Sequence, residues 1–283
     1  GRSSEALACY KKALQDLKQL DGFEADLLFV KTVIGYSKDH RAVANLVEII
    51  DYLHQALERV ERWNNPSLLA LVLMHLASNI YFERENLPAA KAYFDRGFAL
   101  AKDINDPEVE RTVITGTLIS KFYSGQFKSA IKVYETSEPI FAQKYPLHKL
   151  SLRIGILMGL AYAFVGQATQ GLGLMDGIRS HALKIRDYDT AATATAHMAM
   201  VLILIYKFDE AIALLKDPIM TSEKVSDYAK CIGLNYLAHC YFQKGEIKKS
   251  ERFLKQTLNK YGMYTYEIKN KAVFIEICLA MER

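Results

Sequence analysis

The sequence predicts an all-α fold, a right-handed superhelical solenoid of about seven antiparallel helix pairs. Two observations lead to this prediction: a short phrase recurs at a steady spacing, and the stretches between its copies carry apolar residues at helical spacing. The composition agrees, because 6 Pro and 15 Gly in 283 residues are too few for a turn-rich sandwich or barrel. One helix pair cannot bury both of its apolar faces, so neighbouring pairs must stack.

The recurring phrase consists of a turn residue, an apolar residue two positions later and a small residue five positions later. Its clearest copies, GQFKSA, GQATQG, YKFDEA and GEIKKS, begin at Gly125, Gly166, Tyr206 and Gly245. Weaker copies begin at Gly1, His40 and Glu85. Successive turns are therefore 39, 45, 40, 41, 40 and 39 residues apart. This steady period near 40 predicts a single repeat domain over residues 1–283.

Other residue types keep a fixed distance from the turns. Tyrosines stand four residues before several of them, at Tyr36, Tyr81, Tyr162 and Tyr241. Small residues stand seven before, at Ser78, Gly159, Ala199 and Ala238, and large residues nine after most turns. We expect the small residues to let two antiparallel helices approach closely, while the large ones fill the space beyond that contact.

This order of small residue, aromatic residue, turn and small residue resembles the tetratricopeptide (TPR) repeat family over essentially the whole chain. The usual TPR period is about 34 residues. The longer period here is similar to that of the helical sensor arrays in MalT/LuxR-type signal-transduction ATPase regulators. The resemblance implies a TPR-like superhelix that binds ligands or proteins.

Charge and cysteine usage exclude several classes of protein. The net charge of +4 is mild and its charges are interspersed, so we expect no direct binding to nucleic acid. The longest apolar stretch, Met198 to Tyr206, is far shorter than the roughly 20 residues that span a bilayer, so we expect no membrane insertion. The four cysteines form no CxxC pair, which favours reduced thiols and a cytoplasmic location.

Motifs for catalysis are missing from the sequence. It contains no GxxxxGK[ST] phosphate loop, no HExxH zinc motif and no GxSxG nucleophile turn. The glycines between Gly171 and Gly177 have the wrong spacing for a dinucleotide loop, and no strand precedes them. We therefore expect no enzyme activity, no metal site and no cofactor.

The TPR resemblance implies that the first helix of each pair lines a concave groove. It places these candidate ligand-binding residues there: His75, Asn79, Phe82, Tyr123, Arg153, His197, Asn235, Tyr236 and His239. Aromatic rings among amide and imidazole groups suit a small polar metabolite or an uncharged peptide. The alternative is that the groove is filled by its own side chains, because several lining positions are leucines.

The chain opens at a turn and closes in a first helix, so we expect a fragment of a longer protein. Its expected function is non-catalytic ligand sensing, as the sensor part of a bacterial transcription regulator or signalling ATPase. The expected partners are the groove ligand and other modules of the parent protein. The alternative is a freestanding TPR scaffold that binds a peptide segment of another protein.

Overall fold

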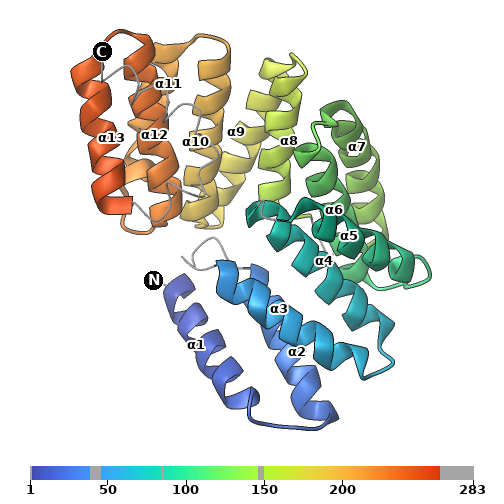
Figure 1. Ribbon diagram of the computed structural model, residues 1–283. Coiled ribbons are helices and arrows are strands. Elements are labelled where there is room, and N and C mark those ends of the chain that lie inside the picture. The colour runs from blue at the N-terminus through green and yellow to red at the C-terminus, as the bar shows by residue number, and fades with distance from the viewer. Residues whose placement is uncertain (1, 39–45, 84–85, 146–149, 262–283) are drawn as a thin grey trace. The chain divides into compact units, whose positions relative to one another are not determined.

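The computed structural model describes residues 2–38, 46–83, 86–145 and 150–261, and these form thirteen α-helices, one 3₁₀ helix and no strand (Figure 1). The helices of the first half are α1 (Arg2–Leu17), α2 (Phe23–Lys38), α3 (Leu46–Glu61), α4 (Pro66–Glu83), α5 (Leu87–Ala101), α6 (Pro107–Tyr123) and α7 (Phe127–Lys144). Those of the second half are α8 (Leu152–Phe164), α9 (Ala168–Lys184), α10 (Tyr188–Leu204), α11 (Phe208–Leu215), η2 (Pro218–Thr221), α12 (Asp227–Gln243) and α13 (Ile247–Tyr261).

From α2 onward the helices form pairs, each with a first helix (α2, α4, α6, α8, α10 or α12) and a second helix (α3, α5, α7, α9, α11 or α13). The two members of every pair contact each other. First helices also contact first helices of neighbouring pairs, as α2 does α4, α4 does α6, α8 does α10, and α10 does α12. The predicted all-α array of helix pairs is confirmed, with six complete pairs and α1 in the described residues. Its right-handed sense stays a prediction.

The chain divides into two compact units, Gly1–Leu150 and Ser151–Arg283. Unit 1 contains α1 to α7, and unit 2 contains α8 to α13. Each unit buries its own apolar side chains, such as Phe29 in unit 1 and Met175 in unit 2. The expectation that residues 1–283 behave as a single domain stays a prediction.

The turns inside the pairs adopt the left-handed backbone region, with φ of 73° at Gly125, 86° at Gly166, 61° at Tyr206 and 74° at Gly245. After each turn residue, the next N–H donates to a carbonyl in the last turn of the helix, as Gln126 does to Lys121 at 2.9 Å. This arrangement satisfies helix-end carbonyls, and glycine adopts it without a Cβ clash. The four strong turn predictions are therefore confirmed, while Gly1, His40 and Glu85 lie outside the described residues.

The small residues around the turns do bring paired helices together. A Cβ on Gly171 of α9 would lie 2.3 Å from the carbonyl oxygen of Gly159 in α8, so only glycine fits there. In the last pair, the Ser250 hydroxyl donates to the carbonyl oxygen of Ala238 at 2.8 Å. Tyr162 and Tyr241 are buried on the first helices of these two pairs, and Tyr36 is buried on α2, as the repeat pattern predicted. The side chain of Tyr81 lies outside the described residues.

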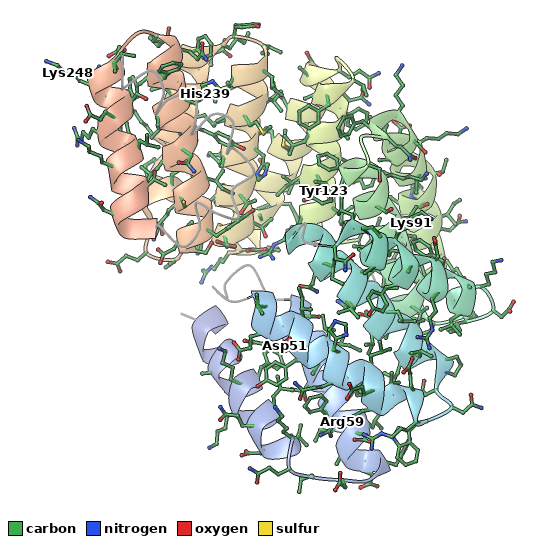
Figure 2. The ribbon with its side chains drawn as sticks, viewed as in Figure 1. Asp51, Arg59, Lys91, Tyr123, His239 and Lys248 are labelled. Carbon is green, nitrogen blue, oxygen red and sulfur yellow. The ribbon has the colours of Figure 1, made fainter. Side chains whose placement is uncertain are left out.

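A buried carboxylate joins the first three helices of unit 1. Asp26 of α2 is 3% exposed, and its Oδ1 accepts a hydrogen bond from Nη1 of Arg59 at 3.0 Å. Its Oδ2 accepts one from the Trp63 indole at 2.8 Å. Arg59, labelled in Figure 2, also donates to the carbonyl oxygen of Leu17 at the end of α1, and its guanidinium lies over the ring of Phe29. This network fixes α1, α2 and α3 against one another.

Helix α11 has 8 residues, whereas its neighbour α9 has 17. Pro218 explains the early end, because the residue before a proline avoids the helical conformation. The chain continues as η2, and Oδ1 of Asp217 accepts the N–H of Ile219 at 2.9 Å. Oδ2 of the same carboxylate lies 2.5 Å from Nη2 of Arg179 on α9, which holds the start of η2 in place.

Candidate ligand-binding face

Partly exposed residues recur on one side of three successive first helices in unit 2. We call this set the first-helix face, and it comprises Arg153 and Leu157 of α8, His197 and Met200 of α10, and Asn235, His239 and Phe242 of α12. Spacings of three and four residues put the members from each helix on one side of it. Because α8 contacts α10 and α10 contacts α12, the three sides adjoin. Polar and apolar groups alternate along this face.

One end of the face is fixed by a charged link across all three helices. Nη2 of Arg153 in α8 lies 3.4 Å from Oδ2 of Asp189 in α10. Oδ1 of Asp189 accepts the backbone N–H of Ser226, the residue that caps α12, at 2.9 Å. Arg153 therefore lies on this face, and its guanidinium is already paired with a carboxylate. Sequence reasoning missed Asp189, since it has no fixed place in the repeat.

In the middle of the face, the orientation of the His197 ring is set by its own helix. Its Nδ1 lies 2.7 Å from the carbonyl oxygen of Thr193. A carbonyl can only accept, so Nδ1 carries the proton and Nε2 of the neutral ring is an acceptor. Tyr236, predicted to line the groove, is instead packed between α10 and α12. It is 7% exposed, and its hydroxyl donates to the sulfur of Met200 at 3.1 Å.

At the other end, His239 lies beside the amide of Gln243 on the same helix. The two Nε2 atoms are 3.1 Å apart, and the amide nitrogen must be the donor (Figure 2 labels His239). Asn235, one turn earlier on α12, is half-buried. Four of the five residues predicted for unit 2 are therefore partly accessible on adjoining helices, and Tyr236 lies beneath them.

In unit 1 the predicted residues lie on α4 and α6. Nδ1 of His75 lies 3.1 Å from the hydroxyl of Ser37 on α2. Asn79 is 2% exposed and donates from Nδ2 to the carbonyl oxygen of His75 at 2.6 Å. Tyr123, labelled in Figure 2, is half-buried. Its ring meets that of Phe122 edge to face. The side chain of Phe82 lies outside the described residues. A single groove shared by all nine residues stays a prediction.

The described residues form neither a metal site nor a membrane-spanning helix. Among the described residues, no three His, Cys, Asp or Glu side chains are grouped so that they could hold a metal ion. In the same part of the chain, no helix combines the length and apolar character that crossing a membrane requires.

Burial raises the pKa of Cys231 and of Cys240 to about 12, so both thiols are protonated at neutral pH.

No protein-family model matches this chain, and neither does any curated protein sequence. Solved structures are similar to it. The Rap protein complexed with Competence and Sporulation Factor aligns with a TM-score of 0.69 at 12% identity, over 99% of this chain and 87% of that one. The fold is TPR-like.

Two further structures support that conclusion. The Signal Transduction ATPase with Numerous Domains (STAND) protein with a tetratricopeptide repeat sensor from Pyrococcus horikoshii gives a TM-score of 0.58 at 19% identity. The alignment covers 95% of this chain but only 42% of the STAND protein. NprR in complex with its cognate peptide NprX aligns with a TM-score of 0.58 at 11% identity, over 89% of this chain and 74% of that one. The predicted resemblance to TPR proteins is confirmed at the level of the fold.

Proposed function

We propose that this chain is a non-catalytic array that binds a ligand on its first-helix face. The alternation of polar and apolar groups across three adjoining helices is the observation that supports this proposal. The imidazoles of His197 and His239 and the carboxamide of Asn235 offer hydrogen-bond donors and acceptors. Leu157 and Phe242 offer apolar contact beside them. A face that only met solvent would instead be rich in lysine and glutamate.

The ligand class that fits this face best is an uncharged, partly apolar peptide. A peptide backbone presents donors and acceptors in turn, and a carboxamide such as that of Asn235 can satisfy one of each. Side chains of the peptide would lie against Leu157, Met200 and Phe242. NprR, which has a similar fold, is known in complex with its cognate peptide NprX. In unit 1 we assign the same role to His75, Phe82 and Tyr123, whereas Asn79, 2% exposed, takes no direct part.

We further propose that the array is the sensing part of a larger cytoplasmic regulator. The STAND protein of similar fold carries its tetratricopeptide repeats as a sensor. A bound peptide could bias an attached module only as far as its affinities for the two states of the array differ. Sequencing the complete gene that encodes this array tests whether it belongs to a larger regulator. We expect the gene to encode an ATPase or DNA-binding module beside the array. A gene that encodes nothing else would favour the freestanding scaffold.

Binding is tested by screening a synthetic hexapeptide library and a set of sugars by thermal shift, with calorimetry on the hits. We expect peptide hits whose affinity falls at least tenfold in Asn235→Ala and in His239→Ala. The control is Lys248→Ala, an exposed residue of α13, which should bind as the wild type does. Hits only among sugars would replace the peptide by a small metabolite. Peptide hits whose affinity is unchanged by both substitutions would contradict the assignment of the binding site to the first-helix face.

A further inference from the structure

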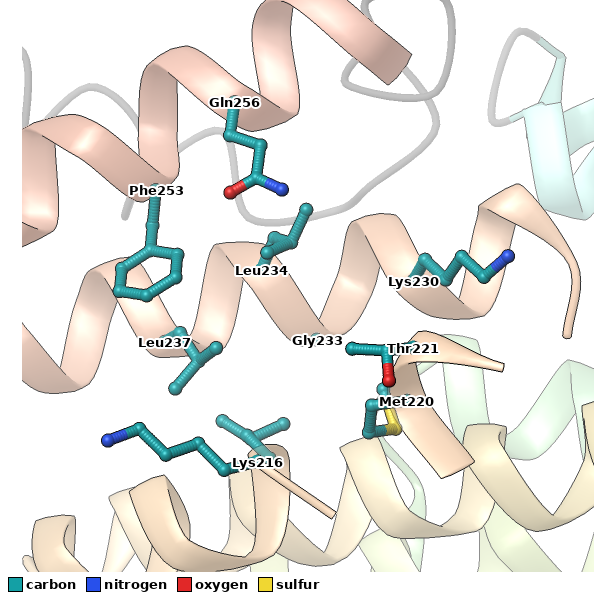
Figure 3. A pocket seen from close by; sticks show the side chains of 10 residues that line it. Lys216, Met220, Thr221, Lys230, Gly233, Leu234, Leu237, Phe253 and Gln256 are labelled. Atoms are coloured by element: carbon teal, nitrogen blue, oxygen red, sulfur yellow. The ribbon is translucent and has the colours of Figure 1, made fainter. Parts of the chain in front are cut away.

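Unit 2 contains a pocket of about 330 Å³ that no member of the first-helix face lines. Its floor is α12, one wall is formed by the end of α11 and by η2, and the opposite wall is α13 (Figure 3). The apolar part of the lining consists of Leu215, Met220, Gly233, Leu234, Leu237 and Phe253. The volume is at the lower end of the range for small-molecule sites.

The pocket exists because of two local features of the sequence. Helix α11 ends at Leu215, so the space that a longer second helix would occupy beside α13 is left to the slighter η2. Gly233 then lets η2 approach the floor, because a Cβ there would lie 2.5 Å from the methyl group of Met220. The ion pair between Arg179 and Asp217 anchors η2 from behind. These walls are therefore built into the fold.

The charge at the pocket has one sign. Of the lining residues that the structure describes, only Lys216 and Lys230 are charged, and they flank the apolar floor at opposite ends (Figure 3). Within the described part of the chain neither lysine forms an ion pair, although Asp227 stands one turn before Lys230. The Asp217 carboxylate close by is already paired with Arg179. Among the described lining residues an anion would meet two ammonium groups and no carboxylate, and the ammonium group of Lys216 also lies 5.9 Å from the ring centre of Tyr241.

This site is separate from the first-helix face, although both use α12. The pocket residues of α12 are Lys230, Gly233, Leu234 and Leu237, and its face residues are Asn235, His239 and Phe242. At about 100° per residue, the two sets are centred roughly 160° apart around the helix. A ligand in the pocket therefore touches the side of α12 that faces away from the proposed peptide.

We propose that this pocket binds a small organic anion with an apolar body, such as an aliphatic carboxylate. The chain of the ligand lies on Leu234, Leu237 and Phe253, and its carboxylate pairs with the ammonium group of Lys216 or Lys230. The amide of Gln256 also lines the pocket and can donate to the carboxylate, whereas the hydroxyl of Thr221 already donates to the carbonyl oxygen of Pro218 at 3.1 Å. The pocket should favour an anion over an apolar cation of the same length, because the cation would be repelled by the two lysines.

The test uses the whole chain with ¹³C-methyl methionine, titrated with octanoate and followed by NMR. The Met220 methyl signal, assigned with Met220→Leu, reports directly on the pocket. We expect a saturable shift of this signal with octanoate, and at least fivefold weaker binding of octylamine. The double variant Lys216→Gln/Lys230→Gln should raise the octanoate Kd at least fivefold, whereas Lys248→Gln should leave it unchanged.

The proposal is overturned if octylamine binds as tightly as octanoate, if the double variant binds like the wild type, or if Met220 does not respond. The variant Asn235→Ala separates this proposal from the peptide proposal. We expect it to leave octanoate binding unchanged, and a loss would place octanoate on the first-helix face instead. Each proposal can therefore fail while the other stands.

Discussion

Asp26 holds a negative charge in the interior of unit 1, where Arg59 and Trp63 share it. Removing one partner of a buried ion pair leaves the other charge without compensation. We expect Asp26→Ala to lower the free energy of unfolding by about 3 kcal/mol in urea denaturation. The matched control is Lys91→Ala, which removes the pair with Asp95 on the surface of α5 and should cost less than about 0.5 kcal/mol. Equal effects from both variants would contradict the role given to Asp26.

Gly171 and Gly173 stand on the same helix but have opposite surroundings. A Cβ at 171 would press on the backbone of Gly159, whereas one at 173 would meet nothing within 4 Å. We expect Gly171→Ala to destabilise by about 2–3 kcal/mol through overpacking. Gly173→Ala should stabilise by about 0.5–1 kcal/mol, because alanine favours the helix. Chemical denaturation of the two variants measures both changes in the free energy of unfolding. An unchanged free energy in Gly171→Ala would refute the close approach of α8 and α9.

Cys231 and Cys240 link stability to pH. Each thiol has a pKa of about 12 in the folded chain, against an ordinary value of 9.0, because burial disfavours the thiolate. The unfolded chain therefore loses these protons first, so their contribution to stability is complete below pH 9 and is lost between pH 9 and about 12.

Reactivity with a thiol reagent at pH 8 measures the same burial in the variant Cys9→Ser/Cys278→Ser, which retains only the two buried thiols. We expect no labelling by Ellman's reagent in the folded state and two equivalents in denaturant. Rapid labelling of the folded variant would show that α12 exposes its thiols.

At the scale of the single element, Tyr206 follows the end of α10 and has a φ of 61°, a conformation that disfavours residues with a Cβ. The equivalent turns use glycine. We expect Tyr206→Gly to stabilise unit 2 by roughly 0.5–1 kcal/mol, since relief of about 1–2 kcal/mol exceeds the loss of the ring contact with Phe208. Tyr206→Ala keeps the Cβ and removes the ring, so it should not stabilise. Thermal unfolding of the wild type, Tyr206→Gly and Tyr206→Ala tests this, and we expect Tyr206→Gly to have the highest Tm.

Sequence reasoning placed the elements well where the cause is local. Gly125, Gly166 and Gly245 marked helix ends because the left-handed turn is decided by one residue. Even Tyr206 was placed correctly, through the period and the small Ala211 that follows. The short α11 was missed, although Asp217 and Pro218 offered the signal: a capping residue followed by proline.

The candidate site was less predictable, because its details depend on contacts between distant residues. The partner of Arg153, Asp189, lies 36 positions away on another helix. The TPR resemblance assigned Tyr236 to the groove, but the packing of α10 against α12 buries its ring. The pocket beside Gly233 required knowing both that α11 stops early and which side of α12 then lies open. Neither follows from residue spacing alone.

At the scale of the whole molecule, each of the two units buries apolar side chains of its own. Repeat arrays are stabilised by contacts between neighbouring repeats, so a unit with several pairs can fold alone. We expect a fragment of residues 151–283 to give a helical circular dichroism spectrum and a cooperative urea transition. In the full chain, Asp26→Ala should lower the stability of unit 1 and leave the transition of unit 2 in place. A fragment without a cooperative transition would show that the units depend on each other.

The common geometry of the turns has a consequence for how such a chain can change over generations. A recombination event that joins one turn to the equivalent turn of another pair removes or adds about 40 residues and recreates the same local backbone at the junction. New copies are then free to diverge on their partly exposed first-helix sides while their junctions stay intact. The array can thus acquire new specificities by gaining or losing whole pairs, a route that is closed to a fold whose core is shared by all its elements.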